Sequence, residues 1–253
     1  MKITFAGTSS GMAVASRAPS ALFIEIDQDA FLIDAGDGTA RQLVKFNLDY
    51  SRIRAIIITH MHADHAAGLI GLIQLMHLSG REEPIVVFVP DSIQHKISEL
   101  LPLHQMFQEK WSFRVLFRGI LDMQKETISS LSFETVRNSH LDKNEFYAQN
   151  HDVSTDSYSL LLGQNNLNKC VYTSDIWDYS HLQDKTNNID TLITECTHVP
   201  FEEGIRFAEM NSISRIIFTH ISPDVDENLD VIRNQYPDPS IQFASDGDII
   251  EIL

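Results

Sequence analysis

The 253-residue sequence predicts an α/β fold, and three observations support this prediction. Short runs rich in β-branched residues recur along the whole chain and are bounded by turn residues, which is typical of strands. Segments with helical patterns lie between these runs. No linker rich in Gly, Pro or Ser interrupts the alternation, so we expect one α/β domain over residues 1–253.

The predicted strands are distributed over the full length of the chain. They occupy Lys2–Ala6, Ala21–Ile26, Ala30–Asp34, Arg54–Thr59, Ile85–Pro90, Phe113–Phe117, Ser132–Asn138, Tyr158–Leu162, Cys170–Ser174, Thr191–Glu195, Arg215–Thr219 and Ile249–Leu253.

Three segments carry helical patterns. Ala66–Ser79 ends before Gly80, Asp91–Leu101 opens on a plausible capping sequence, and Phe201–Asn211 follows a proline. The segment Leu141–Thr155 is polar and has no periodicity, so we expect an inserted loop there.

The composition excludes several classes of protein. The formal charge is −16, which repels nucleic acid and anionic membranes at long range. The longest apolar runs, such as Ile56-Ile57-Ile58, have the length of strands, and the apolar stretch after Met1 is too short for a signal peptide. We therefore expect no membrane segment. With only two cysteines there is no disulfide framework, so we expect a cytoplasmic protein.

Four residues with metal-binding side chains follow the predicted strand Arg54–Thr59. His60 and His62 point to the same side of an extended segment, and Asp64 and His65 come next, where a helix begins. Imidazole nitrogen and carboxylate oxygen are good ligands for zinc and similar divalent ions. Because a strongly apolar strand leads directly into the cluster, a solvated loop is a poor explanation for it.

A second segment repeats this pattern. Arg215–His220, like Arg54–His60, is a hydrophobic run that ends in Thr-His. A pseudo-repeated architecture with a metal ligand at each strand end would produce this similarity. Two unrelated hydrophobic strands would produce it equally well.

The motif His-x-His-x-Asp-His after a strand resembles the signature of the metallo-β-lactamase superfamily. Phe5–Gly11, Ser16–Ser20, Phe31–Gly38 and Gly68–Leu72 are similar to successive blocks of its ribonuclease Z-like branch, and the similarity covers essentially the whole chain. The resemblance implies a four-layer αββα sandwich, with the metal site at one edge of the two sheets.

The resemblance also implies further ligands. A third histidine should end a later strand, as His140 does. His151 is the rival, because it lies closer to the start of the next strand. We favour His140, since a strand end is a rigid place for a ligand. Asp175 fits a bridging carboxylate, although it could simply cap a turn, and His220 fits the last histidine.

The implied centre holds two divalent metal ions. Zinc is the first expectation, and manganese, iron or nickel would accept the same donors. With a bridging hydroxide the centre carries a charge of about +1, which suits a small anionic substrate. The residues around one ion would be His60, His62, His140 and Asp175, and those around the other Asp64, His65, Asp175 and His220.

The expected chemistry is attack by a metal-activated hydroxide, with Asp64 also orienting the nucleophile. Asp34 could accept a hydrogen bond from a ligand histidine, or could be an ordinary turn residue. The run from Glu195 through Cys196 to Thr197 resembles the Glu-Ala-Thr part of a ribonuclease Z motif, and the resemblance implies a catalytic role for Glu195. His198 would then protonate the leaving group, or make only a structural hydrogen bond. We expect Cys196 to be a buried packing residue and not a metal ligand.

Some parts of ribonuclease Z are missing from the sequence. We find no Gly-His-Ser-Thr block between Glu195 and His220, and no Gly- and Lys-rich arm of the kind that clamps tRNA. Lys110, Arg114 and Arg118 form only a sparse basic group. These gaps, together with the acidic charge, disfavour tRNA processing.

The leading hypothesis is therefore a binuclear, phosphodiesterase-type hydrolase of a small anionic ester. The alternatives are a tRNA 3′-processing endoribonuclease, a thioester or lactone hydrolase of the same superfamily, and a relative that has lost catalysis. Asp175 counts against lactams, because B1 lactamases have a metal-binding cysteine there. Members of this branch are often dimeric, so the resemblance leaves open whether the chain forms a homodimer.

The remaining histidines and the tryptophans lack partner spacing. Trp111 and Trp177 are expected to pack, although Trp177 follows Asp175 closely enough to line a pocket. We expect structural or surface roles for His77, His95, His104 and His181.

Overall fold

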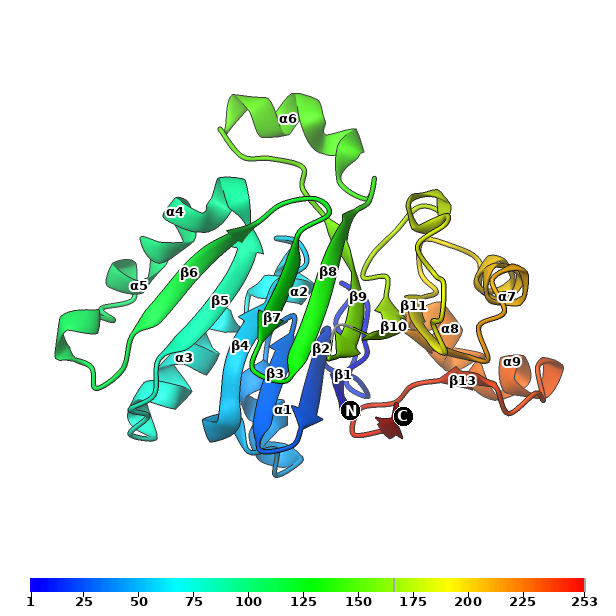
Figure 1. Ribbon diagram of the computed structural model, residues 1–253, viewed down its shortest axis with the longest axis horizontal. Coiled ribbons are helices and arrows are strands. Elements are labelled where there is room, and N and C mark those ends of the chain that lie inside the picture. The colour runs from blue at the N-terminus through cyan, green and yellow to red at the C-terminus, as the bar shows by residue number, and fades with distance from the viewer. Residues whose placement is uncertain (166, 253) are drawn as a thin grey trace.

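Two seven-stranded sheets lie face to face in the computed structural model, which describes residues 1–165 and 167–252 (Figure 1). The first sheet has the order β14 (Ile249–Glu251), β1 (Lys2–Gly7), β2 (Ala21–Ile26), β3 (Asp29–Ile33), β4 (Ile53–Ile57), β5 (Ile85–Pro90) and β6 (Val115–Ile120). The second has the order β13 (Ile241–Phe243), β12 (Arg215–Thr219), β11 (Thr191–Glu195), β10 (Leu167–Tyr172), β9 (Tyr158–Gln164), β8 (Leu131–Arg137) and β7 (Lys125–Ile128).

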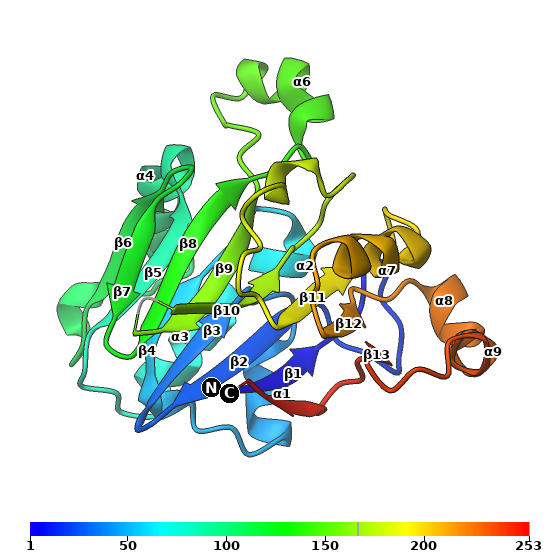
Figure 2. The ribbon, with the colours of Figure 1, turned by 45° about the vertical axis from the view of Figure 1, so that its right-hand side comes forward.

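Helices cover the outer face of each sheet (Figures 1 and 2). Beside the first sheet lie α1 (Thr39–Lys45), α2 (Ala63–Ala66), α3 (Leu69–Leu78), α4 (Gln94–Ser98) and α5 (Leu100–Leu103). Beside the second lie α7 (Phe201–Met210), α8 (Pro223–Glu227) and α9 (Leu229–Gln235). Helix α6 (Glu145–Asn150) stands apart from both layers. Short 3-10 turns occur at η1 (Tyr50–Arg52), η2 (Asp91–Ile93), η3 (Gln108–Lys110), η4 (Asp142–Asn144) and η5 (Ser180–Leu182).

Three hydrophobic clusters hold the four layers together. One fills the space between the sheets, and the other two lie between each sheet and its helices. Strand β3 serves two of them, because successive side chains of a strand point to opposite faces. Phe31 and Ile33 pack between the sheets, whereas Ala30 and Leu32 pack towards the helices. The four-layer αββα sandwich is confirmed.

The two ends of the described chain lie side by side (Figure 2). Strand β1 pairs antiparallel with β14, and the amino group of Met1 donates to the carbonyl of Ile252 at 3.0 Å. A search of the described helices for one with the length and apolarity to cross a bilayer found none.

The predicted helix Ala66–Ser79 is wrong at its start. The chain forms α2 and α3 with a break at Ala67 and Gly68. A Cβ on Gly68 would lie 2.0 Å from the carbonyl oxygen of Gly36, so the backbones meet too closely there for any side chain. The Gly68 N–H donates to Ala35 at 2.8 Å, which ties this break to the end of β3.

Two other predictions need correction. The predicted helix Asp91–Leu101 is divided into η2, α4 and α5, and α5 continues to Leu103. The polar segment Leu141–Thr155 is not a plain loop, because it contains η4 and α6. Its apolar residues Phe146 and Tyr147 are exposed, so no buried stripe marks the helix in the sequence.

Candidate metal centre

The candidate ligands come from four strand ends. His60, His62, Asp64 and His65 follow β4 on a single turn that runs into α2, whereas His140 follows β8. Two further ligands follow parallel strands of the second sheet, Asp175 after β10 and His220 after β12.

The structure brings these seven residues into two groups that share Asp175. Within each group the ligand atoms lie within 4.8 Å of one another. His151, the rival of His140, is exposed at the end of α6 and is in neither group. The groups are His60, His62, His140 and Asp175, and Asp64, His65, Asp175 and His220.

Asp175 turns one carboxylate oxygen to each group. Its Oδ1 lies 3.2 Å from His65 Nε2 and 3.4 Å from His220 Nε2. Its Oδ2 lies 3.6 Å from His140 Nε2 and 3.9 Å from His60 Nε2. This arrangement would allow the carboxylate to bridge two cations.

Buried atoms without partners test whether a metal fits. His60 Nε2, His65 Nε2 and Asp175 Oδ1 are buried and have no hydrogen-bond partner. A buried polar atom without a partner is costly, and these three face one another. Divalent cations would satisfy all three, and neutral imidazole and carboxylate are donors that zinc, manganese, iron and nickel accept.

Asp34 holds the turn that follows β4. Its Oδ2 accepts from His65 Nδ1 at 2.8 Å and from the Tyr172 hydroxyl at 3.0 Å. Its Oδ1 accepts from the backbone N–H and the hydroxyl of Thr59, both at 2.9 Å. A carboxylate that receives a ligand histidine's other N–H fixes the ring and its tautomer. Of the two readings of Asp34, the structure agrees with the hydrogen-bonding one.

Three strand ends at the site have left-handed backbone. The φ angles are 59° at Asp34, 55° at Ser174 and 53° at His220, and none of these residues is glycine. Such conformations are uncommon outside glycine and cluster at functional sites. Here they turn each strand end sharply towards the centre.

Burial and neighbouring charges set the ligands' protonation. Burial lowers the pKa of His60, and lowers that of His140 to about 4. Burial alone would raise the pKa of Asp175, but the surrounding histidines, His220 and His65 foremost, hold it well below its usual value. Neutral imidazoles and an ionised carboxylate are the forms that bind metal.

Glu195 organises the neighbouring turn. Its carboxylate accepts from the backbone N–H groups of Ile176 at 2.8 Å, Thr197 at 3.0 Å and His198 at 2.7 Å. His198 Nδ1 also lies 3.0 Å from both carboxylate oxygens. Glu195, His198 and His220 form a third group of metal-type donors, but this carboxylate is already engaged by three N–H groups. It therefore orients His198.

His198 stands at the entrance of the centre. Its side chain is 24% exposed, and Nδ1 lies 4.0 Å from Asp175 Oδ2. Burial alone would lower the pKa of His198, but the hydrogen bond that its ring donates to Glu195 and the charge of that carboxylate raise it above the ordinary value. Cys196 is buried and burial raises the pKa of its thiol, in agreement with a packing role.

A cleft with a volume of about 360 Å³ opens onto the second ligand group. Its size is that of a site for a small molecule. None of the described residues that line it is Lys or Arg. The lining comprises Ser10, Gly11, Met12, His62, Asp64, Asp175, Thr197, His198, His220, Ser222, Pro223 and Asp224.

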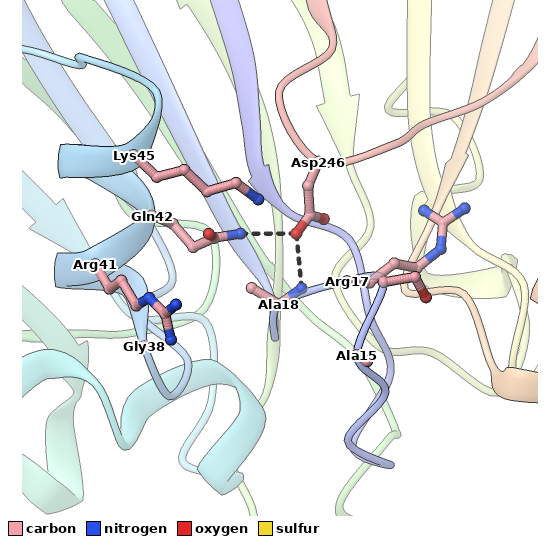
Figure 3. Close-up of a pocket in the computed structure, with 9 residues that line it drawn as sticks. Ala15, Arg17, Ala18, Gly38, Arg41, Gln42, Lys45 and Asp246 are labelled. Carbon is pink, nitrogen blue, oxygen red and sulfur yellow. Dashed lines mark hydrogen bonds between the residues drawn. The ribbon is translucent and has the colours of Figure 1, made fainter.

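A second hollow, of about 250 Å³, lies along α1 (Figure 3). Arg41 and Lys45 line it, together with Asp246. The Asp246 carboxylate accepts from the Gln42 amide and the Ala18 N–H, both at 2.7 Å, as the dashed lines in Figure 3 show. These bonds anchor the loop that continues from the cleft to β2.

The other histidines and the tryptophans are placed away from the ligand atoms, with one exception. His181 is bonded to the Ser159 hydroxyl at 2.8 Å, and Trp111 stacks on His77 and Phe113. Trp177 differs, because its ring N–H donates to the carbonyl of His140 at 2.8 Å. The sequence analysis missed this contact, and only the spacing from Asp175 hinted at it.

Comparison with known proteins agrees with this geometry. Residues 1–221 match the family described as Anti-Pycsar protein Apyc1. The chain belongs to this family. Its match begins at residue 1 and covers every candidate ligand from His60 to His220.

Other relatives of this Apyc1-family chain are ribonuclease Z-like. The ribonuclease Z of Natronomonas pharaonis is 40% identical over 101 residues, which are 40% of this chain and 32% of that protein. The chain thus spans about a third of that curated relative, and 42% of the ribonuclease Z of Prochlorococcus marinus strain AS9601.

Solved structures share the fold. The short form of human tRNase Z superposes with a TM-score of 0.77 at 21% identity and covers 100% of both chains. A diphosphatase from the PhnP family superposes with a TM-score of 0.73 at 19% identity, covering 99% of this chain and 97% of that one. The predicted metallo-β-lactamase fold of ribonuclease Z-like type is therefore confirmed.

Proposed function

We propose that this chain is a binuclear metal-dependent hydrolase of a small phosphodiester. The observation that carries the proposal is Asp175, which presents one oxygen to each of two groups of imidazole nitrogen and carboxylate donors. Two divalent ions held there would lower the pKa of water and neutralise charge on the attacked phosphoryl group. The ligands would be the seven residues of the two groups.

The chain's own residues supply the remaining steps. Asp64 Oδ2 lies 3.1 Å from His220 Nε2 at the edge of the cleft, where it can orient an attacking water. His198 lines the same cleft, and Glu195 keeps it oriented and favours its protonated form. It can therefore give a proton to the leaving alkoxide.

The cleft supports a small substrate. It has no Lys or Arg among its described lining residues, so an anion would be held by the metal centre and by the hydroxyls of Ser10, Thr197 and Ser222. A long polyanion needs several cations along its backbone, and the chain carries a charge of −16. Relatives named ribonuclease Z and tRNase Z keep tRNA cleavage as the second candidate.

Parallel assays separate the two functions. The substrates are bis(p-nitrophenyl) phosphate, a nucleoside 3′,5′-cyclic phosphate as a compact natural phosphodiester, and a precursor tRNA. We expect the zinc- or manganese-loaded protein to hydrolyse the first two and leave the tRNA intact. The matched control is Asp175→Asn, which should be inactive on every substrate. Cleavage of precursor tRNA with no turnover of the small esters would overturn the proposal.

A further inference from the structure

We propose that Trp177 is a positioning residue for His140, which sets the affinity of the first ligand group for its metal ion. The inference rests on the metal centre of the proposed function, but not on the identity of the substrate. Each ligand histidine has one ring nitrogen that faces the metal centre and one, its outward nitrogen, that faces away from it.

The outward nitrogens of the ligand histidines differ in their hydrogen-bond partners. His65 Nδ1 donates to Asp34 at 2.8 Å, and His60 Nδ1 lies 3.2 Å from the Thr59 hydroxyl. His140 Nδ1 is buried and has no hydrogen-bond partner in the described chain. Ligand histidines usually need such a partner, because it fixes the ring and raises its basicity. His140 must be oriented in another way.

His140 Nε2 is the nitrogen that faces the centre. It lies 3.6 Å from Asp175 Oδ2 and 3.2 Å from His62 Nδ1. The backbone N–H of His140 donates to the Asn138 side chain at 3.1 Å, which holds the start of the turn. The contact with Asn138 holds the backbone and does not fix the rotation of the imidazole.

Trp177 supplies one contact to the backbone of His140 and one to its imidazole ring. Its Nε1–H donates to the carbonyl oxygen of His140 at 2.8 Å. Its ring stacks on the His140 imidazole, with centroids 5.7 Å apart and planes at 29°. Because Trp177 is only two residues after Asp175, it ties the turn that carries the bridging carboxylate to the turn that carries His140.

Lys143 and His198 also contact the indole ring of Trp177. The Lys143 ammonium lies 3.6 Å from the centre of a Trp177 ring, a cation–π contact from the same turn as His140. The His198 ring meets the indole at 5.2 Å and 72°. Trp177 nevertheless remains 37% exposed, so filling the core does not account for it. Its contacts are with the centre.

The test is zinc affinity, measured by competition with a chromogenic chelator. Trp177→Phe keeps an aromatic ring but removes the N–H. We expect it to weaken one of the two binding steps about 10-fold, in the range seen when a partner of a ligand is removed, and to leave the other unchanged. The control is Trp111→Phe, since Trp111 stacks on Phe113 and His77 away from the ligands. It should leave both steps unchanged.

A second readout uses no variant of Trp177. In the Trp111→Phe protein Trp177 is the only tryptophan, so its fluorescence reports on His140 directly. We expect Co²⁺ to quench this emission in the step assigned to the first ligand group. Unchanged zinc affinities in folded Trp177→Phe, or emission that does not respond to Co²⁺, would overturn the inference alone. A wild-type chain that binds no metal would overturn the proposed function as well.

Discussion

The two halves of the metal centre are built in opposite ways. The first half is a single turn after β4 that carries His60, His62, Asp64 and His65 within six residues, and Asp34 holds it through hydrogen bonds with Thr59 and His65. The second half collects one ligand from each of three separate strands of the other sheet. The first is therefore a local property of the sequence, whereas the second depends on the sheets packing correctly.

The largest effect should come from Asp175, the residue that the two ligand groups share. Asp175→Asn keeps the size of the side chain but removes the charge that both groups share. We expect loss of both ions and a fall in kcat of about 10³-fold or more, because the ions supply several kcal/mol of transition-state stabilisation. Metal analysis and phosphodiester kinetics check this. An active variant with two ions would show that the two ligand groups do not depend on Asp175.

His198 tests chemistry separately from metal binding. His198→Ala should lower kcat about 10²- to 10⁴-fold, the usual contribution of a general acid, while metal content stays the same. The loss should be smaller for p-nitrophenolate, which leaves without a proton, than for an alkoxide. Equal losses for both leaving groups would assign His198 a structural role with Glu195.

Asp34 tests the rigidity of the first half. Asp34→Asn replaces the acceptor of the His65 N–H, and we expect the second ligand group to bind its ion about 10- to 100-fold more weakly. Asp29→Asn, at the start of the strand that precedes Asp34, is the matched control, since its carboxylate bonds to Arg54 and Ser129, away from the ligands. Equal effects of the two substitutions on zinc affinity would contradict a special role for Asp34.

The smallest effect concerns the metal-free protein. His140 has a folded pKa of about 4, below the unfolded value of 6.5. The unfolded chain therefore takes up this proton first, so the stability that neutral His140 contributes is complete above pH 6.5 and is lost as pH falls towards 4. We expect the free energy of unfolding of metal-free His140→Gln to fall less than that of the wild type as the pH falls from 6.5 to 4. Denaturant titrations in the presence of a chelator measure this difference. Parallel curves would refute the assignment.

The difference between the halves also explains what the sequence could predict. The turn from His60 to His65 is visible because four ligands and the strand before them are contiguous. The resemblance to a superfamily supplied His140, Asp175 and His220, and the structure places all three with the first half. The residues that hold these ligands in place could not be predicted from the sequence. Trp177, for example, contacts His140 only because two turns pack against each other.

The fold shows the same division. Buried strands such as β4 and β12 were predicted within one or two residues, because β-branched residues fill them. Strand β7 was missed, since it is a short edge strand with charged residues, as edge strands often are. The break at Gly68 was missed because its cause is the approach of Gly36, which lies elsewhere in the sequence.

Metal stoichiometry tests the central claim most directly. The purified chain is stripped with chelator, dialysed against Zn²⁺ and measured by mass spectrometry of the metal and by protein concentration. We expect two ions per chain for the wild type, and one for a His140→Ala variant, which retains the second ligand group. A folded wild-type chain that binds no zinc, manganese, iron or nickel would contradict it.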